Sequence, residues 1–253
     1  MKTKTVTLIV LLFTLLISCS QENQVEVKHE RQNGLIVPSN YEDEDICCIY
    51  LPKDGLNVFD QPDGQKIGIL TKNIESNTGT EAGYRVYFVD NNSKTETKIE
   101  IANFKEIGYE SFSILYFERK DGFVRIINQS VDYWLNENEI KNKKFRVIDW
   151  QQFFMETSGQ LLGFYANNPG IDLKSEPTKN SETKKLLEGE LFEITPTNES
   201  SGNWTRVKVK KYKEHPCETE LDAKDNLEYE IEGWIEIISN DGKPNLWYYS
   251  RGC

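Results

Sequence analysis

The stretch that decides the fold is GLNVFDQP at residues 55–62, and a second version of it, GIDLKSEP, stands at residues 170–177. Each version starts with glycine, alternates apolar, polar and apolar residues, and reaches proline seven residues after the glycine. The alternation predicts a short β-strand, and the proline predicts the turn that follows it. We therefore expect two copies of one unit in the chain.

Further matched segments follow each version in the same order. An apolar segment with glycine comes next, at residues 67–70 and 186–189, and then FVRI at 123–126 matches WTRV at 204–207. Last come Trp134 and Leu135 in the first copy, against Trp234 and Ile235 in the second. Short strands of this kind close into a small barrel, which removes exposed sheet edges and fills its interior with the apolar side chains.

These marks resemble the bacterial SH3-type domain, and the second copy, with its closing Gly233 and Trp234, is the more similar. The first copy departs from the family pattern at Phe59, at Phe123 and at Tyr133. The resemblance implies an all-β protein of two small SH3-like β-barrels in tandem. We expect the first at residues 46–148, with a large insert after Leu70, and the second, with a C-terminal strand, at residues 161–253.

The segment between the two copies breaks the strand rhythm. Trp150, Phe153 and Phe154 recur at helical spacing, so we expect a short helical linker at residues 149–160, with its apolar face packed between the barrels.

We expect a signal peptide at positions 1–18. Lys2 and Lys4 precede an apolar run at residues 6–17, which is shorter than the roughly 20 residues of a membrane-spanning helix. The end of the run, LISC at 16–19, resembles the bacterial lipobox, which implies lipidation of Cys19 and attachment to the membrane. Cleavage by an ordinary signal peptidase and an uncleaved anchor are the alternatives.

A polar stretch follows the lipobox, and we interpret residues 19–45 as the lipidated cysteine and a flexible tether. Ser20 rather than aspartate follows Cys19, and by resemblance to bacterial lipoprotein sorting this favours the outer membrane. The expected location is therefore the cell envelope.

Four further cysteines, Cys47, Cys48, Cys217 and Cys253, allow three complete pairings. Export makes disulfides stable, and we predict one between Cys217 and Cys253, where it would hold the end of the chain. No Cys-x-x-Cys motif or histidine cluster accompanies them, so we expect no metal site. Residues 90–96 space oxygen atoms like part of a calcium loop, but without its glycine they favour a β-turn.

Charge and motifs restrict the remaining functions. The net charge of −11 disfavours nucleic acid as a partner, because an acidic surface repels phosphates. Only two histidines occur, His29 in the predicted tether and His215 in a polar insert, so no general base is placed beside a nucleophile. Phosphate-binding and dinucleotide motifs are absent from the sequence. We therefore expect no catalytic residues, no cofactor and no enzyme activity.

The hypothesis that remains is a binding module for peptidoglycan, through its peptide or glycan, or for an envelope protein. Exposed aromatic side chains would supply the contact surface. The candidate ligand-binding residues are Trp134, Trp234, Tyr248 and Tyr249, and further groove candidates are Tyr50, Phe59, Tyr165 and Trp204. For all of these except Tyr248 and Tyr249, a role in the core is the alternative and the more common one. The alternative function is a structural or inhibitory, immunity-type partner of another envelope protein.

Overall fold

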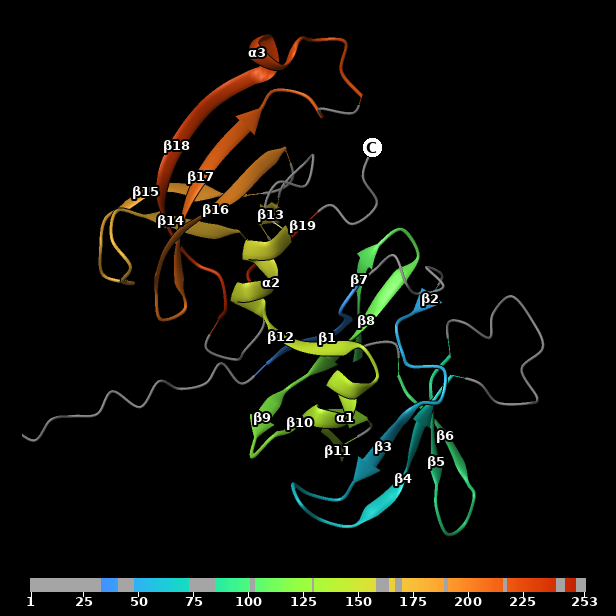
Figure 1. Cartoon of the computed structure of the whole chain (residues 1–253). Helices are drawn as coiled ribbons and strands as arrows, with labels where there is room; N and C mark the ends of the chain where they lie inside the picture. Colours follow the sequence, from blue (N-terminus) through green and yellow to red (C-terminus); the bar gives the residue numbers. More distant parts are fainter. Residues whose placement is uncertain are drawn as a thin grey trace, which may run out of the picture. The chain divides into compact units, whose positions relative to one another are not determined.

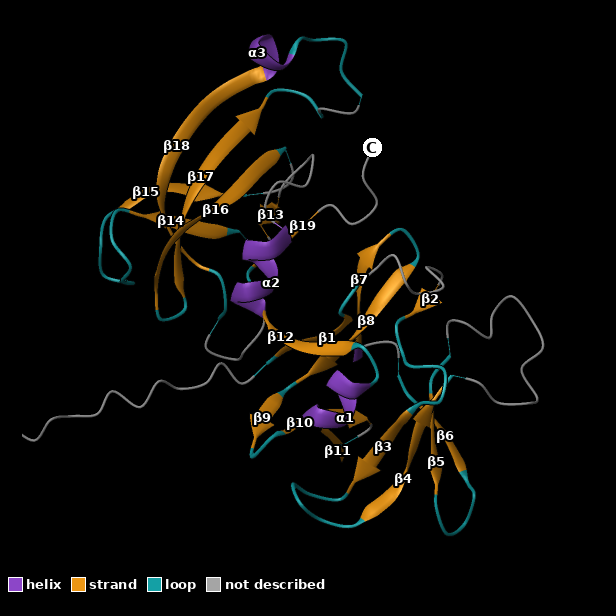
Figure 2. Ribbon diagram, viewed as in Figure 1, coloured by secondary structure: helices purple, strands orange, loops and turns teal. Residues whose placement is uncertain are grey.

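The computed structural model describes residues 33–40, 48–72, 85–100, 103–128, 130–157, 164–166, 170–188, 191–215, 218–239 and 244–248, and the statements below refer to them. They form nineteen strands and three short helices, with the strands in three sheets (Figures 1 and 2). The prediction of an all-β protein is thereby confirmed. Arg31–Cys253 forms one compact unit.

The first copy of the repeat contributes two sheets. One has the order β6-β5-β4-β3-β11-β10-β9, and the other has the order β12-β1-β8-β2, with β7 also paired to β8. The elements are β1 (Gly34–Pro38), β2 (Cys48–Ile49), β3 (Leu56–Phe59), β4 (Lys66–Thr71), β5 (Tyr87–Asp90), β6 (Glu96–Lys98), β7 (Phe104–Gly108), β8 (Ser111–Tyr116), β9 (Glu118–Lys120), β10 (Phe123–Asn128), β11 (Val131–Asn136), α1 (Glu137–Asn142) and β12 (Phe145–Asp149).

The second copy forms one sheet with the order β15-β14-β18-β17-β16-β13-β19, preceded by helix α2. Its elements are α2 (Trp150–Thr157), β13 (Phe164–Ala166), β14 (Ile171–Lys174), β15 (Thr183–Leu187), β16 (Phe192–Ser201), β17 (Trp204–Tyr212), α3 (Ala223–Asn226), β18 (Leu227–Glu236) and β19 (Leu246–Tyr248).

The two copies follow the same path through their strands. In the first, β4, β3, β11, β10 and β9 are neighbours in that order, as β15, β14, β18, β17 and β16 are in the second. Strands β8 and β9 together take the place of β16. Strand β1 pairs antiparallel with β8 and β12, and β13 pairs antiparallel with β16 and β19. Only β2, β5, β6 and β7 of the first copy lack a counterpart in this order.

The register repeats at the level of single residues. The pairing of β3 with β4 shifts between Val58 and Phe59, and that of β14 with β15 shifts at the equivalent point, after Leu173. Trp134 lies opposite Phe59, and Trp234 lies opposite Lys174. Each closing tryptophan therefore occupies the same place in its sheet.

The glycine that opens each version is required by the hairpin that follows. Gly55 has a φ of 72° and Gly170 a φ of 120°, a region that disfavours other residues. A Cβ atom on Gly55 would lie 2.3 Å from the Leu70 carbonyl oxygen, and one on Gly170 would lie 2.6 Å from the Leu187 carbonyl oxygen. Glycine is thus needed both for the conformation and for the approach of the partner strand.

Strand β1 corrects one part of the predicted flexible tether at residues 19–45, because residues 34–38 form a strand of the first unit, which therefore begins before residue 46. Residues 19–32 and 41–45 of that tether lie outside the described part. Leu35, Ile36 and Val37 are each 0% exposed. Ile36 belongs to the core of the first copy, whereas Leu35 and Val37 belong to the core that contains the second copy. A strand buried on both faces shows no alternation of apolar and polar residues, so its pattern did not stand out within a polar stretch.

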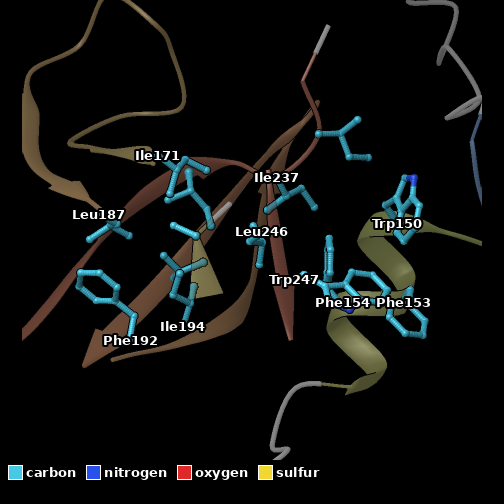
Figure 3. Packing of buried hydrophobic residues seen from close by; sticks show 14 of the residues in the cluster. Trp150, Phe153, Phe154, Ile171, Leu187, Phe192, Ile194, Ile237, Leu246 and Trp247 are labelled. Atoms are coloured by element: carbon cyan, nitrogen blue, oxygen red, sulfur yellow. The ribbon is translucent and has the colours of Figure 1, made fainter. Parts of the chain in front are cut away.

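Helix α2 lies where helical spacing predicts a helix, although residues 158–160 of the predicted linker are outside the described part. Trp150, Phe153 and Phe154 are buried on one side of it and pack against Trp247 of β19 (Figure 3). The rings of Phe153 and Trp247 are stacked with centroids 5.6 Å apart. The same core includes Leu35, Val37 and Ile148, so this cluster combines residues from both copies.

Candidate functional site

A pocket of about 370 Å³ lies at one end of the second copy. It is lined by two cations, two carboxylates, an indole, an amide and small or apolar residues: Gly170, Ile171, Asp172, Lys174, Lys179, Leu186, Trp204, Glu236 and Asn245. These residues come from β14, β15, β17, β18 and the segments beside them. Leu186 is 48% exposed and Trp204 is half-buried, so the pocket offers apolar surface next to its charges.

The charged side chains of this pocket are held in pairs. Lys174 is 8% exposed, and its Nζ donates to Thr183 Oγ1 at 2.6 Å and lies 3.2 Å from Asp172 Oδ2. Lys179 Nζ lies 3.3 Å from Glu236 Oε2, at the more exposed side. Lys174 is therefore fixed in the wall, whereas the exposed ammonium of Lys179 can turn towards a ligand.

The turn that carries Lys179 is built from local hydrogen bonds. Ser181 Oγ donates to the carbonyl groups of Glu176 and Thr178, each at 2.9 Å. The Ser175 N–H donates to the Glu182 carbonyl at 2.9 Å and closes the hairpin behind it. Polar side chains of this kind satisfy backbone groups that a tight turn leaves without partners. These hydrogen bonds therefore fix the backbone of the turn from which the Lys179 side chain extends.

The equivalent place in the first copy is filled by helix α1. The N–H of Asn57 donates to both carboxylate oxygens of Glu139, at 3.1 and 3.2 Å. Lys143 Nζ lies 3.0 Å from Glu139 Oε1 and 3.1 Å from Asp54, and donates to the Gly55 carbonyl. The Asn136 side chain accepts from the Glu139 N–H at 3.0 Å and caps the helix. The first copy therefore closes this place with its own residues, whereas the described residues of the second copy leave a pocket there.

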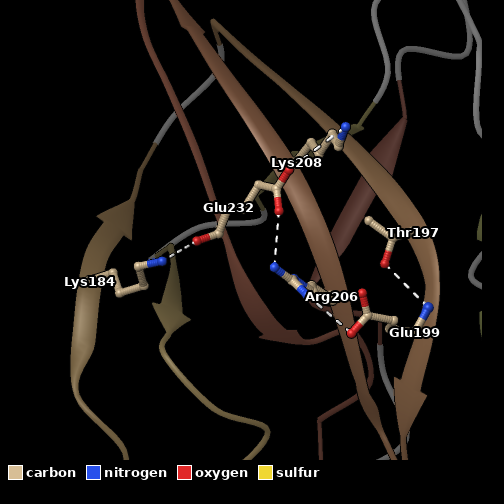
Figure 4. A network of polar contacts seen from close by, with 6 residues as sticks. All are labelled: Lys184, Thr197, Glu199, Arg206, Lys208 and Glu232. Carbon is tan, nitrogen blue, oxygen red and sulfur yellow. Dashed lines mark hydrogen bonds and ion pairs between the residues drawn. The ribbon is translucent and has the colours of Figure 1, made fainter.

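An arginine with two carboxylates marks the same position of both sheets. Arg206 lies 2.9 Å from Glu199 and 3.1 Å from Glu232 (Figure 4). Its hydrogen bond to Glu199 is the main reason why the pKa of Arg206 is raised. In the first copy Arg125 lies 2.9 Å from both Glu118 and Asp132. Because both copies have this arrangement across three neighbouring strands, we interpret it as a structural lock and not as a ligand site.

The residues predicted to bind a ligand are dispersed. Trp134 is 8% exposed and Tyr50 is buried, so each offers little ring surface. Trp234 is half-buried opposite Arg206 and Lys174. The backbone of Tyr248 lies in β19, paired with Phe164. Outside the described part lie the side chains of Tyr165 and Tyr248 and the whole of Tyr249, Cys19, Cys217 and Cys253. Lipidation and the disulfide stay predictions.

Of the groove candidates whose side chains the structure describes, Trp204 lines the pocket, and its charged neighbours were missed. A signal for them was present in the repeat itself. Counted from the opening glycine, Lys174 stands where the first copy has Phe59, and Lys179 stands where it has Gly64. A difference of this kind between two copies of one unit indicates a position that only one copy uses.

The predicted turn after Asp90 is present. Asp90 Oδ1 accepts hydrogen bonds from the N–H groups of Asn92 and Ser93 and from Ser93 Oγ, and the bonds from Ser93 hold the pKa of Asp90 below its usual value. Among the described residues no group of three or more His, Cys, Asp or Glu side chains could hold a metal ion. In the same part of the chain no helix is long and apolar enough to cross a bilayer.

The lining of the pocket offers several kinds of contact to a ligand. Its ammonium, carboxylate, amide and indole groups can hydrogen-bond, ion-pair and stack with a ligand. A search of family models, of curated proteins and of solved structures found no match to this chain.

Proposed function

We propose that this chain is a non-catalytic binding module of the cell envelope, attached to the outer membrane through lipid on Cys19. Two SH3-like β-barrels in tandem would form its folded part. The second barrel takes a cell-wall peptide or glycan, or a segment of an envelope protein, in the pocket beside Trp204.

The observation that carries the proposal is the difference between the copies. Both follow one strand order, yet α1 occupies the end of the first hairpin and a pocket lies at the same end of the second. An open pocket that combines an indole, an exposed leucine and two lysines suits a ligand with both apolar and polar groups. The strand order, with first and last strands paired in each copy, supports the barrel interpretation.

Co-sedimentation tests the proposal directly. The chain from residue 20 onwards keeps the whole compact unit Arg31–Cys253 and would be incubated with purified peptidoglycan and, separately, with solubilised envelope proteins. We expect it to bind one of these, and we expect Trp204→Ala to lose the binding. Tyr109→Ala, an exposed aromatic residue of the first copy, serves as the control and should bind normally.

Two results would change the assignment. Retention of one specific protein whose activity falls on binding would favour the structural or inhibitory partner, the alternative function. Equal binding by Trp204→Ala and by the unmodified chain would refute the pocket as the binding site. The mass of the protein isolated from membranes tests the lipid on Cys19 independently.

A further inference from the structure

The first copy holds a carboxylate at the point where its strand ladder ends. The pairing of β11 with β3 consists of Trp134 with Phe59 and Leu135 with Val58. The Asn57 N–H would continue this ladder towards β11, and it donates instead to the Glu139 carboxylate. A charged acceptor on a backbone N–H makes a stronger hydrogen bond than a neutral one. This end of the hairpin therefore binds a carboxylate in the first copy.

The second copy repeats the backbone but not the occupant. The pairing of β14 with β18 consists of Lys174 with Trp234, which is the same register as Phe59 with Trp134. Asp172 stands two residues before Lys174, as Asn57 stands two residues before Phe59. Both strands have their register shift at the same point, after Val58 and after Leu173, so the Asp172 N–H is the equivalent of the Asn57 N–H. Asp172 itself lines the pocket.

An ammonium group accompanies the carboxylate in the first copy and is present at the pocket of the second. Lys143 Nζ lies 3.0 Å from Glu139. At the pocket, Lys174 is held within the wall and Lys179 lies at the open side. The equivalent of each donor in the first copy, a backbone N–H and an ammonium, therefore belongs to the lining of the pocket in the second.

We propose that the pocket of the second copy binds the carboxylate of an acidic side chain from a partner peptide. This inference rests on the proposed function and specifies the chemistry of its ligand. The carboxylate takes the place that Glu139 has in the first copy, accepting from the Asp172 N–H, and Lys179 exchanges Glu236 for the incoming group. Trp204 and Leu186 contact the apolar residues next to the acidic one.

Titration by nuclear magnetic resonance tests the proposal with a matched pair of peptides. The chain from residue 20 onwards, labelled with ¹⁵N, is titrated with Ac-Leu-Glu-Leu-NH₂ and with Ac-Leu-Gln-Leu-NH₂. The acidic peptide should shift the backbone amide signal of Asp172 and the indole signal of Trp204. We expect it to bind about tenfold more tightly than the amide peptide, because a hydrogen bond to a charged group is lost with the glutamine.

Two lysine variants distinguish a specific effect of Lys179 at the pocket from the general effect of removing one positive charge. Lys179→Gln should reduce affinity for the acidic peptide about tenfold and leave the amide peptide almost unaffected. Lys208→Gln is the matched control, because Lys208 has a similar exposure, 57% against 55%, and is also paired with a glutamate of β18. Equal binding of both peptides, or equal effects of both lysine variants, would overturn the proposal.

A third variant tests whether the chain supplies its own carboxylate. Asp241 belongs to a segment outside the described residues, between β18 and β19 in sequence. If Asp241→Asn binds the acidic peptide and the unmodified chain does not, the occupant is internal and the partner proposal is wrong. Capture of peptidoglycan or of an envelope protein that depends on Trp204, without any binding of acidic peptides, would refute this inference and leave the proposed function intact.

Discussion

Glu139 allows the comparison of the two copies to be tested by stability alone. Its carboxylate accepts from the Asn57 N–H and pairs with Lys143, and its side chain is 16% exposed. Glu139→Ala removes this carboxylate, and the alanine side chain has no atom that can accept a hydrogen bond. The N–H of Asn57 then stays without a protein partner at the end of the ladder between β3 and β11.

The expected loss can be estimated from these contacts. Leaving a buried backbone donor unsatisfied costs about 1–3 kcal/mol, and the part-buried Asn57 N–H falls within this range or below it. The pair with Lys143 adds roughly 0.3–0.5 kcal/mol, because Lys143 keeps its contact with Asp54. A loss of about 2 kcal/mol lowers the melting temperature of a chain of this size by roughly 4–8 °C.

Thermal unfolding followed by circular dichroism measures this shift. Glu139→Gln keeps an acceptor oxygen and should lose less than Glu139→Ala. Glu96→Ala, at an exposed position of β6, should change stability by no more than about 0.5 kcal/mol. Sodium acetate should raise the melting temperature of Glu139→Ala more than that of the unmodified chain, since it returns a carboxylate to the site. A melting temperature for Glu139→Ala equal to that of Glu96→Ala would show that the Asn57 contact contributes nothing.

Three further predictions concern the core, the hairpin glycines and pH. Phe154→Ala should destabilise the protein by about 3–5 kcal/mol in urea unfolding, because the ring is fully buried; a loss below 1 kcal/mol would contradict its place in the core. Gly202→Ala should cost about 1–2 kcal/mol from its positive φ alone, and Gly170→Ala should cost more, because its Cβ also meets a carbonyl oxygen; the reverse order in the same assay would refute the argument. The hydrogen bond from Arg146 lowers the pKa of Glu156, so the pair stabilises the fold above pH 4.5, and this stabilisation is lost as the pH falls through the lowered pKa. For such an exposed pair the contribution is below about 1 kcal/mol. Glu156→Gln should remove this part of the acid dependence, and an acid unfolding curve equal to that of the unmodified chain would refute the contribution of the pair.

The repeated strands could be predicted because their sequence has a period. β3 and β14 alternate apolar and polar residues before a proline, and the ladder places them identically in both copies. β1 could not be found in this way, because burial on both faces removes the alternation. Its role depends on pairing with β8 and β12, which are distant in sequence and have no local signal.

The candidate site was predictable only in part. An indole beside the second hairpin follows from the position of Trp204, but the pocket depends on where β14 and β18 separate. Lys179 and Glu236 are more than fifty residues apart and meet only in the folded sheet. The closure of the first copy requires helix α1, a short segment whose six residues give a weak helical signal by themselves.

The place of β1 determines how the protein responds to mechanical load. A force that acts through the amino-terminal segment reaches Gly34 before any other described strand residue. That strand has neighbours along both edges, so a pull along it must shear two ladders at once, which resists force better than peeling a strand from the rim of a sheet. Since its side chains enter both cores, extracting it would loosen the two copies together, and stretching of single molecules should show one rupture instead of two.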